Sequence, residues 1–242
     1  REAGVVLLVC VGEQSKNTAF AFGANSVCFG AEEGEKAALA ATLNDYIVRD
    51  GHLTTGFLGT PYLCHALSNN GYTELAYRIL LHEGYPGWLY SVKMGGTTIW
   101  ELWDSMKPDR TIPDTGMNSF NHYSKGAVGD WLYREAVGLK EISAGYKTFM
   151  VRPNPGGGFK YMGADKVTPY GRAAAKWYDE PGKFTLEVEV PANTTAEICQ
   201  SIYFQSDFII FVFNVFIIEI GHEIPKHNTI NNSNTSANCS IK

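Results

Sequence analysis

Residues 32–83 read EEGEKAALAATLNDYIVRDGHLTTGFLGTPYLCHALSNNGYTELAYRILLHE, and this stretch decides the fold class. Its first third has acidic residues in the opening turn, followed by apolar residues at helical spacing up to Gly51. We therefore expect an amphipathic helix that begins near residue 32 and turns its apolar face to a core.

Two more helices should follow in close succession. Thr60 followed by Pro61 is typical of a helix N-terminus, and the SNNG stretch at 68–71 is typical of a helix end. From about 73 to 83, leucine, alanine and isoleucine residues recur on one helical face. The short connection between these two helices predicts an αα-hairpin.

A fourth helix is expected to start near Asn118 or Ser119, because apolar residues recur at helical spacing beyond that point. Residues 17–28 are a weaker helical candidate. The connections over 84–96 and 104–117 are long, and long loops in a compact domain are usually functional.

The pattern changes to short strands from about Leu139. Residues 147–152 alternate in polarity, and KFTLEVEV at 183–190 alternates without a break. Residues 193–198 are a further strand candidate. We expect an all-β module that ends near residue 199 and folds as a small sandwich.

Residues 200–242 look unlike a continuation of this β module. The stretch FIIFVFNVFII at 208–218 is almost entirely apolar, but polar residues flank and interrupt it, so it is too short for a membrane helix. The stretch after it is rich in Asn and Ser, which is typical of disorder. We expect a divergent tail that is disordered or foreign; a functional anchor and an extra core strand are the alternatives.

Composition excludes several classes of function. The 242 residues include 20 basic and 25 acidic side chains, a net charge of −5, with no basic run, which argues against a nucleic-acid partner. Five widely spaced cysteines form no metal-ligand pattern, so we expect neither a metal site nor a disulfide framework. We expect no membrane partner. The chain begins with Arg1 instead of Met, which suggests a piece of a longer protein.

The segment GGTTIWELWDS at 95–105 is the strongest candidate for chemistry. It sets Glu101 between Trp100 and Trp103 and continues to a second acid, Asp104. An indole face can stack on the C–H face of a sugar ring, and a carboxylate beside it can polarise a water molecule or a hydroxyl group. The alternative is an amphipathic segment with core tryptophans and a solvated glutamate.

The stretch MNSFNHY at 117–123 adds polar groups to this candidate. It brings Asn118, Asn121 and His122 to the expected helix N-terminus, where free N–H groups favour oxygen-rich ligands. An ordinary surface position is the alternative for His122. Three further candidates lie in the connecting segments: Trp88, Asp109 and Asp114.

Together these segments resemble the bacterial-type α-L-rhamnosidases of glycoside hydrolase family 78, in order from about residue 32 to 198. The resemblance rests on HLTTGFLGTPYL, NNGYTELAYRILL, YPGWLY, GGTTIWELWDS, MNSFNHYSKGAVGDWLYR, RPNPGGG, TPYGR and FTLEVEVPANTTAE. The family has an (α/α)6 barrel followed by a β-sandwich. The resemblance thus implies a mainly α chain, with a partial barrel of about five helices over 1–138, a β-sandwich over 139–199 and the divergent tail over 200–242.

The resemblance also implies an activity, the hydrolysis of terminal α-L-rhamnose from glycosides with inversion and without a cofactor. In such a mechanism one carboxyl group protonates the leaving oxygen, and a second, about 6.5–9.5 Å away, activates water on the opposite face. The Glu of the TTIWE motif is the family's general base, here Glu101, and the His of MNSFNHY contacts the sugar, here His122. Trp100 and Trp103, and more weakly Trp88, would shape the rhamnose subsite.

The sequence departs from the family where the general acid is concerned. The Asp/Arg/Glu-rich motif that carries the family's acid is missing here, and a full barrel needs more helices than this chain offers. We therefore expect a C-terminal fragment of an inverting α-L-rhamnosidase that acts on a rhamnose-containing glycoside, holds the base and lacks the acid. The alternatives are a non-catalytic carbohydrate-binding fragment or pseudoenzyme, and another (α/α)6 glycosidase that acts on a different sugar.

Overall fold

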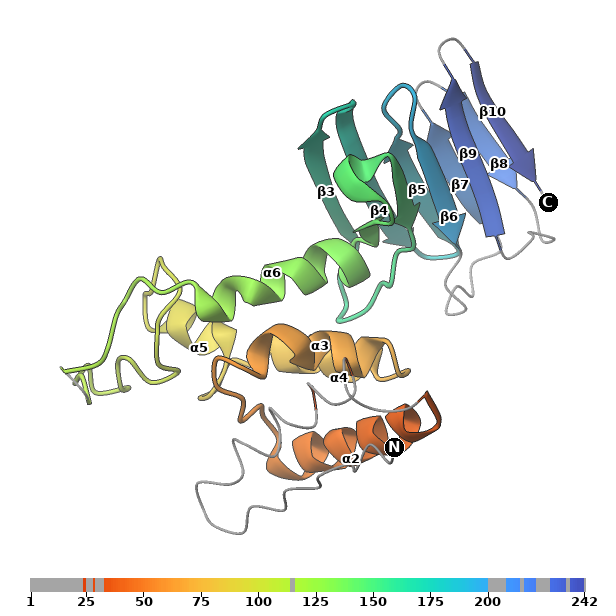
Figure 1. The fold of residues 1–242 in the computed structure, drawn as a ribbon. Coiled ribbons are helices and arrows are strands. Elements are labelled where there is room, and N and C mark those ends of the chain that lie inside the picture. The colour runs from red at the N-terminus through yellow and green to blue at the C-terminus, as the bar shows by residue number, and fades with distance from the viewer. Residues whose placement is uncertain are drawn as a thin grey trace, which may run out of the picture. The chain divides into compact units, whose positions relative to one another are not determined.

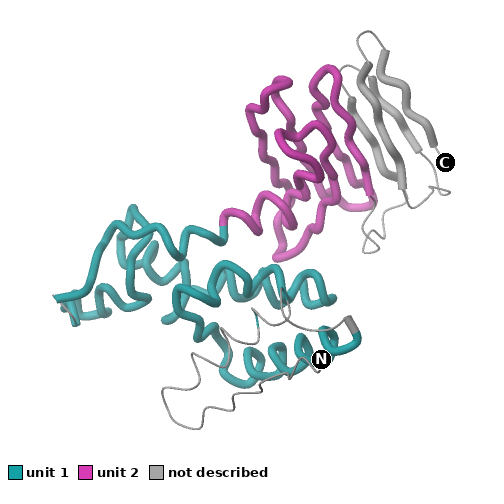
Figure 2. Tube along the Cα trace, in the orientation of Figure 1, with its two compact units in different colours: residues 1–128 teal, residues 129–242 magenta. Residues whose placement is uncertain are grey.

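The computed structural model describes residues 24, 28, 33–113 and 116–199, together with the backbone of four strands between 208 and 241. The chain divides into two compact units, residues 1–128 and residues 129–242 (Figure 2). The first unit is helical and the second is built from β-strands (Figure 1).

Four α-helices and one 3-10 turn make up the described part of the first unit. They are α2 (Glu33–Asp50), α3 (Thr60–Ser68), α4 (Thr73–Leu80), α5 (Trp88–Lys93) and the 3-10 helix η2 (Ser124–Ala127). The first three confirm the helices expected from periodicity, and α3 and α4 pack against each other as the expected hairpin (Figure 1). Their apolar faces are buried, with Leu43, Ile47 and Leu67 almost inaccessible to solvent.

Two expectations about helices were wrong. The stretch 84–96, expected as a loop, contains the short helix α5. The helix expected to start at Asn118 or Ser119 begins only at Ser124. The N–H groups of Ser119 and His122 are already engaged, because both bond to the upstream segment that contains Glu101. Of the weak candidate over 17–28, only residues 24 and 28 are described.

A helical segment leads into the second unit. Helix α6 (Val128–Trp131) continues as the π-helical turn η3 (Leu132–Ala136). The carbonyl of Ala136, at its end, accepts a hydrogen bond from the buried indole N–H of Trp177 at 3.0 Å. Gly138 follows with a φ of 87°, and a Cβ there would lie 2.2 Å from the carbonyl carbon of Arg152, so only glycine fits where the chain passes this strand end.

Two five-stranded sheets form the body of the second unit. One has the order β1-β2-β6-β9-β10 and the other the order β3-β4-β5-β7-β8. The first contains β1 (Leu139–Glu141), β2 (Thr148–Val151), β6 (Thr195–Cys199), β9 (His227–Ser233) and β10 (Ser236–Ile241). The second contains β3 (Tyr161–Thr168), β4 (Gly171–Glu180), β5 (Lys183–Glu189), β7 (Phe208–Phe213) and β8 (Phe216–Ile220). All neighbours pair antiparallel except β2 with β6 and β5 with β7.

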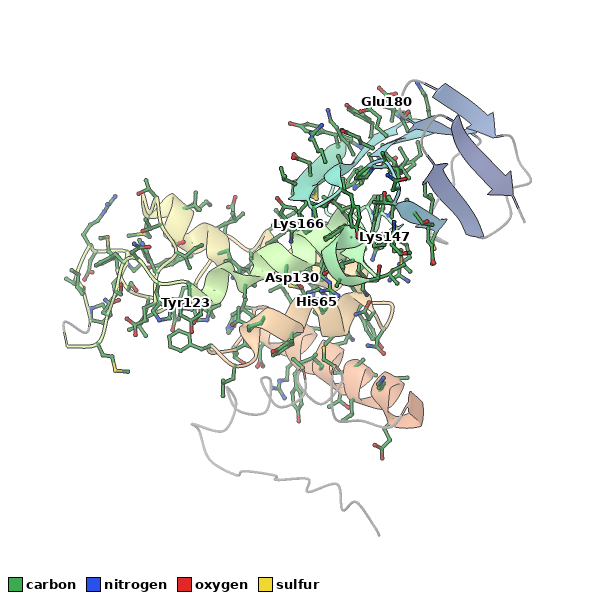
Figure 3. All side chains as sticks on the ribbon, turned by 45° about the horizontal axis from the view of Figure 1, so that its top comes forward. His65, Tyr123, Asp130, Lys147, Lys166 and Glu180 are labelled. Carbon is green, nitrogen blue, oxygen red and sulfur yellow. The ribbon has the colours of Figure 1, made fainter. Side chains whose placement is uncertain are left out.

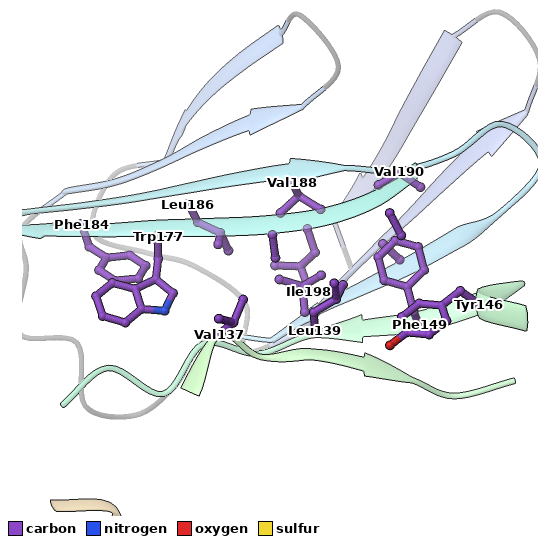
Figure 4. Close-up of a cluster of buried hydrophobic side chains, with 14 residues drawn as sticks. Val137, Leu139, Tyr146, Phe149, Trp177, Phe184, Leu186, Val188, Val190 and Ile198 are labelled. Carbon is purple, nitrogen blue, oxygen red and sulfur yellow. The ribbon is translucent and has the colours of Figure 1, made fainter. Parts of the chain in front are cut away.

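Strands of both sheets supply the hydrophobic core of this unit (Figure 4). Strand β5 alternates as its sequence predicts, with Phe184, Leu186 and Val188 buried and the residues between them partly exposed. Trp177 from β4 is fully buried and stacks on Phe184, with ring centroids 6.2 Å apart. The packing of one apolar face against another makes this unit a small sandwich.

The expected division at residue 138 and the expected tail over 200–242 stay predictions. In the tail, the structure describes the backbone of four strands that pair with β5, with β6 and with each other. Within the described residues, no helix combines the length and apolar character needed to cross a bilayer.

Candidate active site

Two loop segments of the helical unit pair through their main chains and bring Glu101 and His122 into one small region. The N–H of Glu101 donates to the Ser119 carbonyl at 2.8 Å, and the N–H of His122 donates to the Ile99 carbonyl at 2.8 Å. The Thr98 hydroxyl also donates to the carbonyl of Phe120. These bonds fix residues 98–101 against residues 119–122, although neither segment forms a regular strand.

The Glu101 carboxylate is held by the same pairing. Its Oε2 accepts a hydrogen bond from the Ser119 N–H at 2.8 Å. Ser119 therefore bonds to Glu101 twice, once through its carbonyl and once through its N–H. Because Oε2 is occupied, Oε1 is the oxygen left to meet a water molecule or a substrate, and the side chain is partly exposed, as such a role requires.

His122 lies in a stack of three rings. Its imidazole is 4.9 Å from the Phe57 ring and 5.1 Å from the Tyr123 ring, and both pairs are within 20° of parallel. Tyr123, labelled in Figure 3, is 86% exposed. The N–H of Ser124 donates to Nδ1 of His122 at 3.3 Å, so a neutral ring carries its proton on Nε2 and offers a donor there.

Trp100 is the buried residue of segment 98–101. It is only 4% exposed and meets Phe120 edge to face at 5.4 Å. A Cβ on Gly96 would lie 2.9 Å from the Trp100 ring and 2.8 Å from the Ser91 carbonyl. The second glycine of the GGTTIWE motif is thus required by close packing on this indole.

Trp88 and Trp103 form a second aromatic group together with Lys125. The two indoles meet edge to face at 5.3 Å. The Trp88 N–H donates to the carbonyl of Lys125 at 2.8 Å, and the Trp103 N–H donates to the carbonyl of Thr55 at 2.8 Å. Trp88 is 9% exposed and Trp103 is partly exposed, so Trp103 is the better placed of the two to offer a ring face.

Lys125 is the residue of this region that sequence reasoning missed. It is 4% exposed, and its Nζ lies 4.0 Å from the centroid of the Trp103 ring. Loss of solvent lowers the pKa of the amine to about 7, against the negative charges of Asp104 and Glu101, which raise it. Only the position of Lys125 after the MNSFNHY motif marks it in the sequence, and a lysine there looks like a solvated helix residue.

The remaining polar candidates have local structural partners. Asp109 accepts bonds from the N–H and the hydroxyl of Thr111, which lowers the pKa of its carboxyl group and closes a turn. Asn118 donates through Nδ2 to the carbonyl of Ser105 at 3.0 Å. Asp114 lies outside the described residues.

No group of His, Cys, Asp and Glu side chains within the described residues is arranged to hold a metal ion.

Two family models match the chain in succession. The bacterial alpha-L-rhamnosidase 6 hairpin glycosidase domain covers residues 13–136, and the bacterial alpha-L-rhamnosidase C-terminal domain covers residues 138–200. The chain belongs to the bacterial α-L-rhamnosidase family. The resemblance drawn from the sequence motifs is therefore confirmed.

Curated members of the family are similar over most of this chain. An alpha-L-rhamnosidase of Streptomyces avermitilis is 43% identical over 150 residues, which is 62% of this chain and 15% of that protein. One from Formosa agariphila is 42% identical over 167 residues, which is 69% of this chain and 18% of that protein. The chain thus spans less than a fifth of the length of these rhamnosidases.

Solved rhamnosidase structures share the fold. The Streptomyces avermitilis alpha-L-rhamnosidase complexed with L-rhamnose superposes with a TM-score of 0.72 at 37% identity, over 79% of this chain and 19% of that one. The Aspergillus terreus enzyme gives 0.72 at 32% identity, over 86% of this chain and 23% of that one. The expected fold class, a partial (α/α)6 barrel followed by a small β-sandwich, is confirmed.

Proposed function

We propose that this chain carries the base side of an inverting α-L-rhamnosidase site, with Glu101 as the general base. The observation that supports it is the main-chain pairing of residues 98–101 with residues 119–122. That pairing holds one oxygen of the Glu101 carboxylate on the Ser119 N–H and, within the described residues, leaves the other without a hydrogen-bond donor. His122, the proposed sugar-binding residue, lies on the segment that pairs with the one carrying Glu101.

In the proposed reaction, Oε1 of Glu101 takes a proton from water as the water oxygen bonds to the anomeric carbon of α-L-rhamnose. The bond from that carbon to the leaving oxygen breaks on the opposite face, and a general acid supplies the proton that the leaving oxygen needs. His122 donates from Nε2 to a sugar hydroxyl. Trp103 offers its ring to the C–H face of the sugar, while Trp88 and Trp100 hold the subsite walls in place.

Turnover on an aryl α-L-rhamnoside tests this proposal. We expect the 242-residue chain to be slow or inactive by itself, because the family's acid motif is not in its sequence, and losing an acid–base partner costs about 10²–10⁴-fold in rate. Rapid hydrolysis that is abolished in Glu101→Gln, but not in the exposed control Glu35→Gln, would support Glu101 as the base and show that the chain also contains an acid. Rapid hydrolysis that Glu101→Gln leaves unchanged would exclude Glu101 as the base.

A second candidate is non-catalytic binding of rhamnose or of a related carbohydrate. The partly exposed Trp103 ring, fixed by its bond to the Thr55 carbonyl, favours it, because a rigid aromatic face binds sugars without any acid–base chemistry. Saturable binding of L-rhamnose without turnover would support this function.

A further inference from the structure

Asn118 precedes Ser119, the residue whose N–H holds the Glu101 carboxylate. Its side chain does not turn to solvent. Instead its Nδ2 donates to the carbonyl of Ser105 at 3.0 Å, and Ser105 is fully buried. The Asn118 amide therefore links the segment that supplies the donor to the turn that directly follows the proposed base.

That turn, over residues 102–105, is closed by the Ser105 hydroxyl. This hydroxyl accepts the N–H of Leu102 at 3.1 Å and donates to the carbonyl of the same residue at 3.1 Å. Within the turn, the Trp103 indole donates to the carbonyl of Thr55 at 2.8 Å. A turn with so many internal and external bonds moves as a unit, so a bond to Ser105 also fixes the position of Glu101 at its start.

Two bonds thus bracket the contact between the base and its donor. The Glu101 N–H donates to the Ser119 carbonyl at one end, and the Asn118 amide donates to the Ser105 carbonyl at the other. Between them Oε2 of Glu101 meets the Ser119 N–H at 2.8 Å. A hydrogen bond weakens steeply as its distance and angle depart from the optimum. Without the second bond, the turn could shift along residues 118–119 and the carboxylate would lose its donor.

Stability of the fold alone does not account for an amide at this position. Within the described part of the chain, Oδ1 of Asn118 is buried and accepts no hydrogen bond. The cost of a buried acceptor without a donor offsets what the bond from Nδ2 contributes to stability. An apolar side chain of similar size would therefore serve folding about as well, whereas only a donor can hold the Ser105 carbonyl.

We propose that Asn118 is a positioning residue for the general base. Its Nδ2 holds the turn over residues 102–105 against residues 118–119 and so keeps Oε2 of Glu101 on the Ser119 N–H. This inference rests on the proposed function, because it gives Asn118 a part in the same site. Asn118 acts through Ser105 and Ser119.

Amide hydrogen exchange of the 242-residue chain, followed residue by residue in NMR spectra at pH 7, tests this role. In Asn118→Leu we expect the Ser119 amide to exchange about two- to tenfold faster, the range of one weakened hydrogen bond. The amide of the buried Leu67 in helix α3 should keep its native rate. Asn69→Leu, at an exposed asparagine, is the matched control and should change neither rate. Asn118→Ala is the second variant and should act in the same direction.

A double-mutant cycle separates positioning of the base from a general structural role. Glu101→Ala removes the carboxylate that accepts the Ser119 N–H and should by itself speed the exchange of that amide. In this background Asn118→Leu should have little further effect, because both changes act on the same bond. A merely structural role would speed Ser119 exchange by the same factor with and without the carboxylate.

Three results would overturn the inference. Native Ser119 exchange in Asn118→Leu, or the same acceleration in both backgrounds, would do so and would leave Glu101 as the proposed base. Equal acceleration at Ser119 and Leu67 would mean that Asn118 stabilises the whole unit. If Glu101→Ala alone left Ser119 exchange unchanged, the bond between the two residues would not form in solution. The proposed function would then lose the observation that supports it, together with the inference.

Discussion

Replacing Lys125 by methionine should stabilise the protein at pH 6 by about 2 kcal/mol, and the gain should disappear as the pH rises above 10. Burial lowers the pKa of the amine from its ordinary 10.5 to about 7. Since one pKa unit corresponds to about 1.4 kcal/mol, keeping the charged amine in this place costs the folded state about 5 kcal/mol at most. Partial solvation of the group and the lost cation–ring contact reduce the expected net gain to about 2 kcal/mol.

The pH range over which the stability changes is set by the pKa of Lys125 in the folded chain and in the unfolded chain. Below pH 7 both are protonated, so the folded state bears the full cost of the buried charge. Between pH 7 and 10.5 the folded state has released the proton while the unfolded chain still binds it, so the native protein gains stability with rising pH. Above 10.5 both are neutral and the advantage of methionine is lost.

Urea unfolding at pH 6 and at pH 9.5, followed by tryptophan fluorescence, measures the difference. Lys107→Met, which removes an exposed amine, should give no change that depends on pH. A Lys125→Met variant that is less stable than the native chain at pH 6, or whose gain is equal at both pH values, would show that the amine is not buried over Trp103.

Two further changes test how the site is built. Gly96→Ala should destabilise the chain by about 1–3 kcal/mol, because the added Cβ meets the Trp100 ring at 2.9 Å and a backbone carbonyl at 2.8 Å; urea unfolding measures it. His122→Phe should keep the ring stack with Phe57 while it removes the Nε2 donor, so the fold should persist and the affinity for L-rhamnose should fall about tenfold or less, as NMR titration would show.

For each of these two changes, one result would contradict the prediction. Gly34→Ala in helix α2 is the control for Gly96, because nothing lies within 4 Å of its added Cβ and alanine favours a helix. Equal effects at the two glycines would remove the packing argument for the GGTTIWE motif. Native affinity in His122→Phe would mean that the imidazole stacks but does not bind the sugar.

Periodicity in the sequence was sufficient to predict a helix or strand where one face of that element packs against a core. The helices from Glu33 and Thr60 and the strand from Lys183 follow this rule, since the apolar spacing alone fixes which side chains are buried. Periodicity did not predict strands β3 and β4. Their inward positions include Ala164, Ala173 and Ala175, which carry little hydrophobic signal, and Trp177 is the one large side chain that marks the buried face of β4.

The motifs identified the family, and the resemblance they carry led us to propose Glu101 and His122 as site residues. The late start of the helix at Ser124 was not predictable in the same way. Residues 119–122 have helical periodicity, but the N–H groups of Ser119 and His122 bond to a segment some twenty residues upstream, and those bonds compete with the helix.

The sequence by itself therefore determined the family, the order of helical and β units, and the residue that we propose as the base, because each depends on local spacing or on a motif. Only the tertiary structure decided that His122 stacks on Phe57 and on Tyr123, that Trp100 is buried, and that Lys125 lies over Trp103. The reason is physical: the burial of a charged amine is a property of the surroundings that distant segments create, and no local pattern of residues records it.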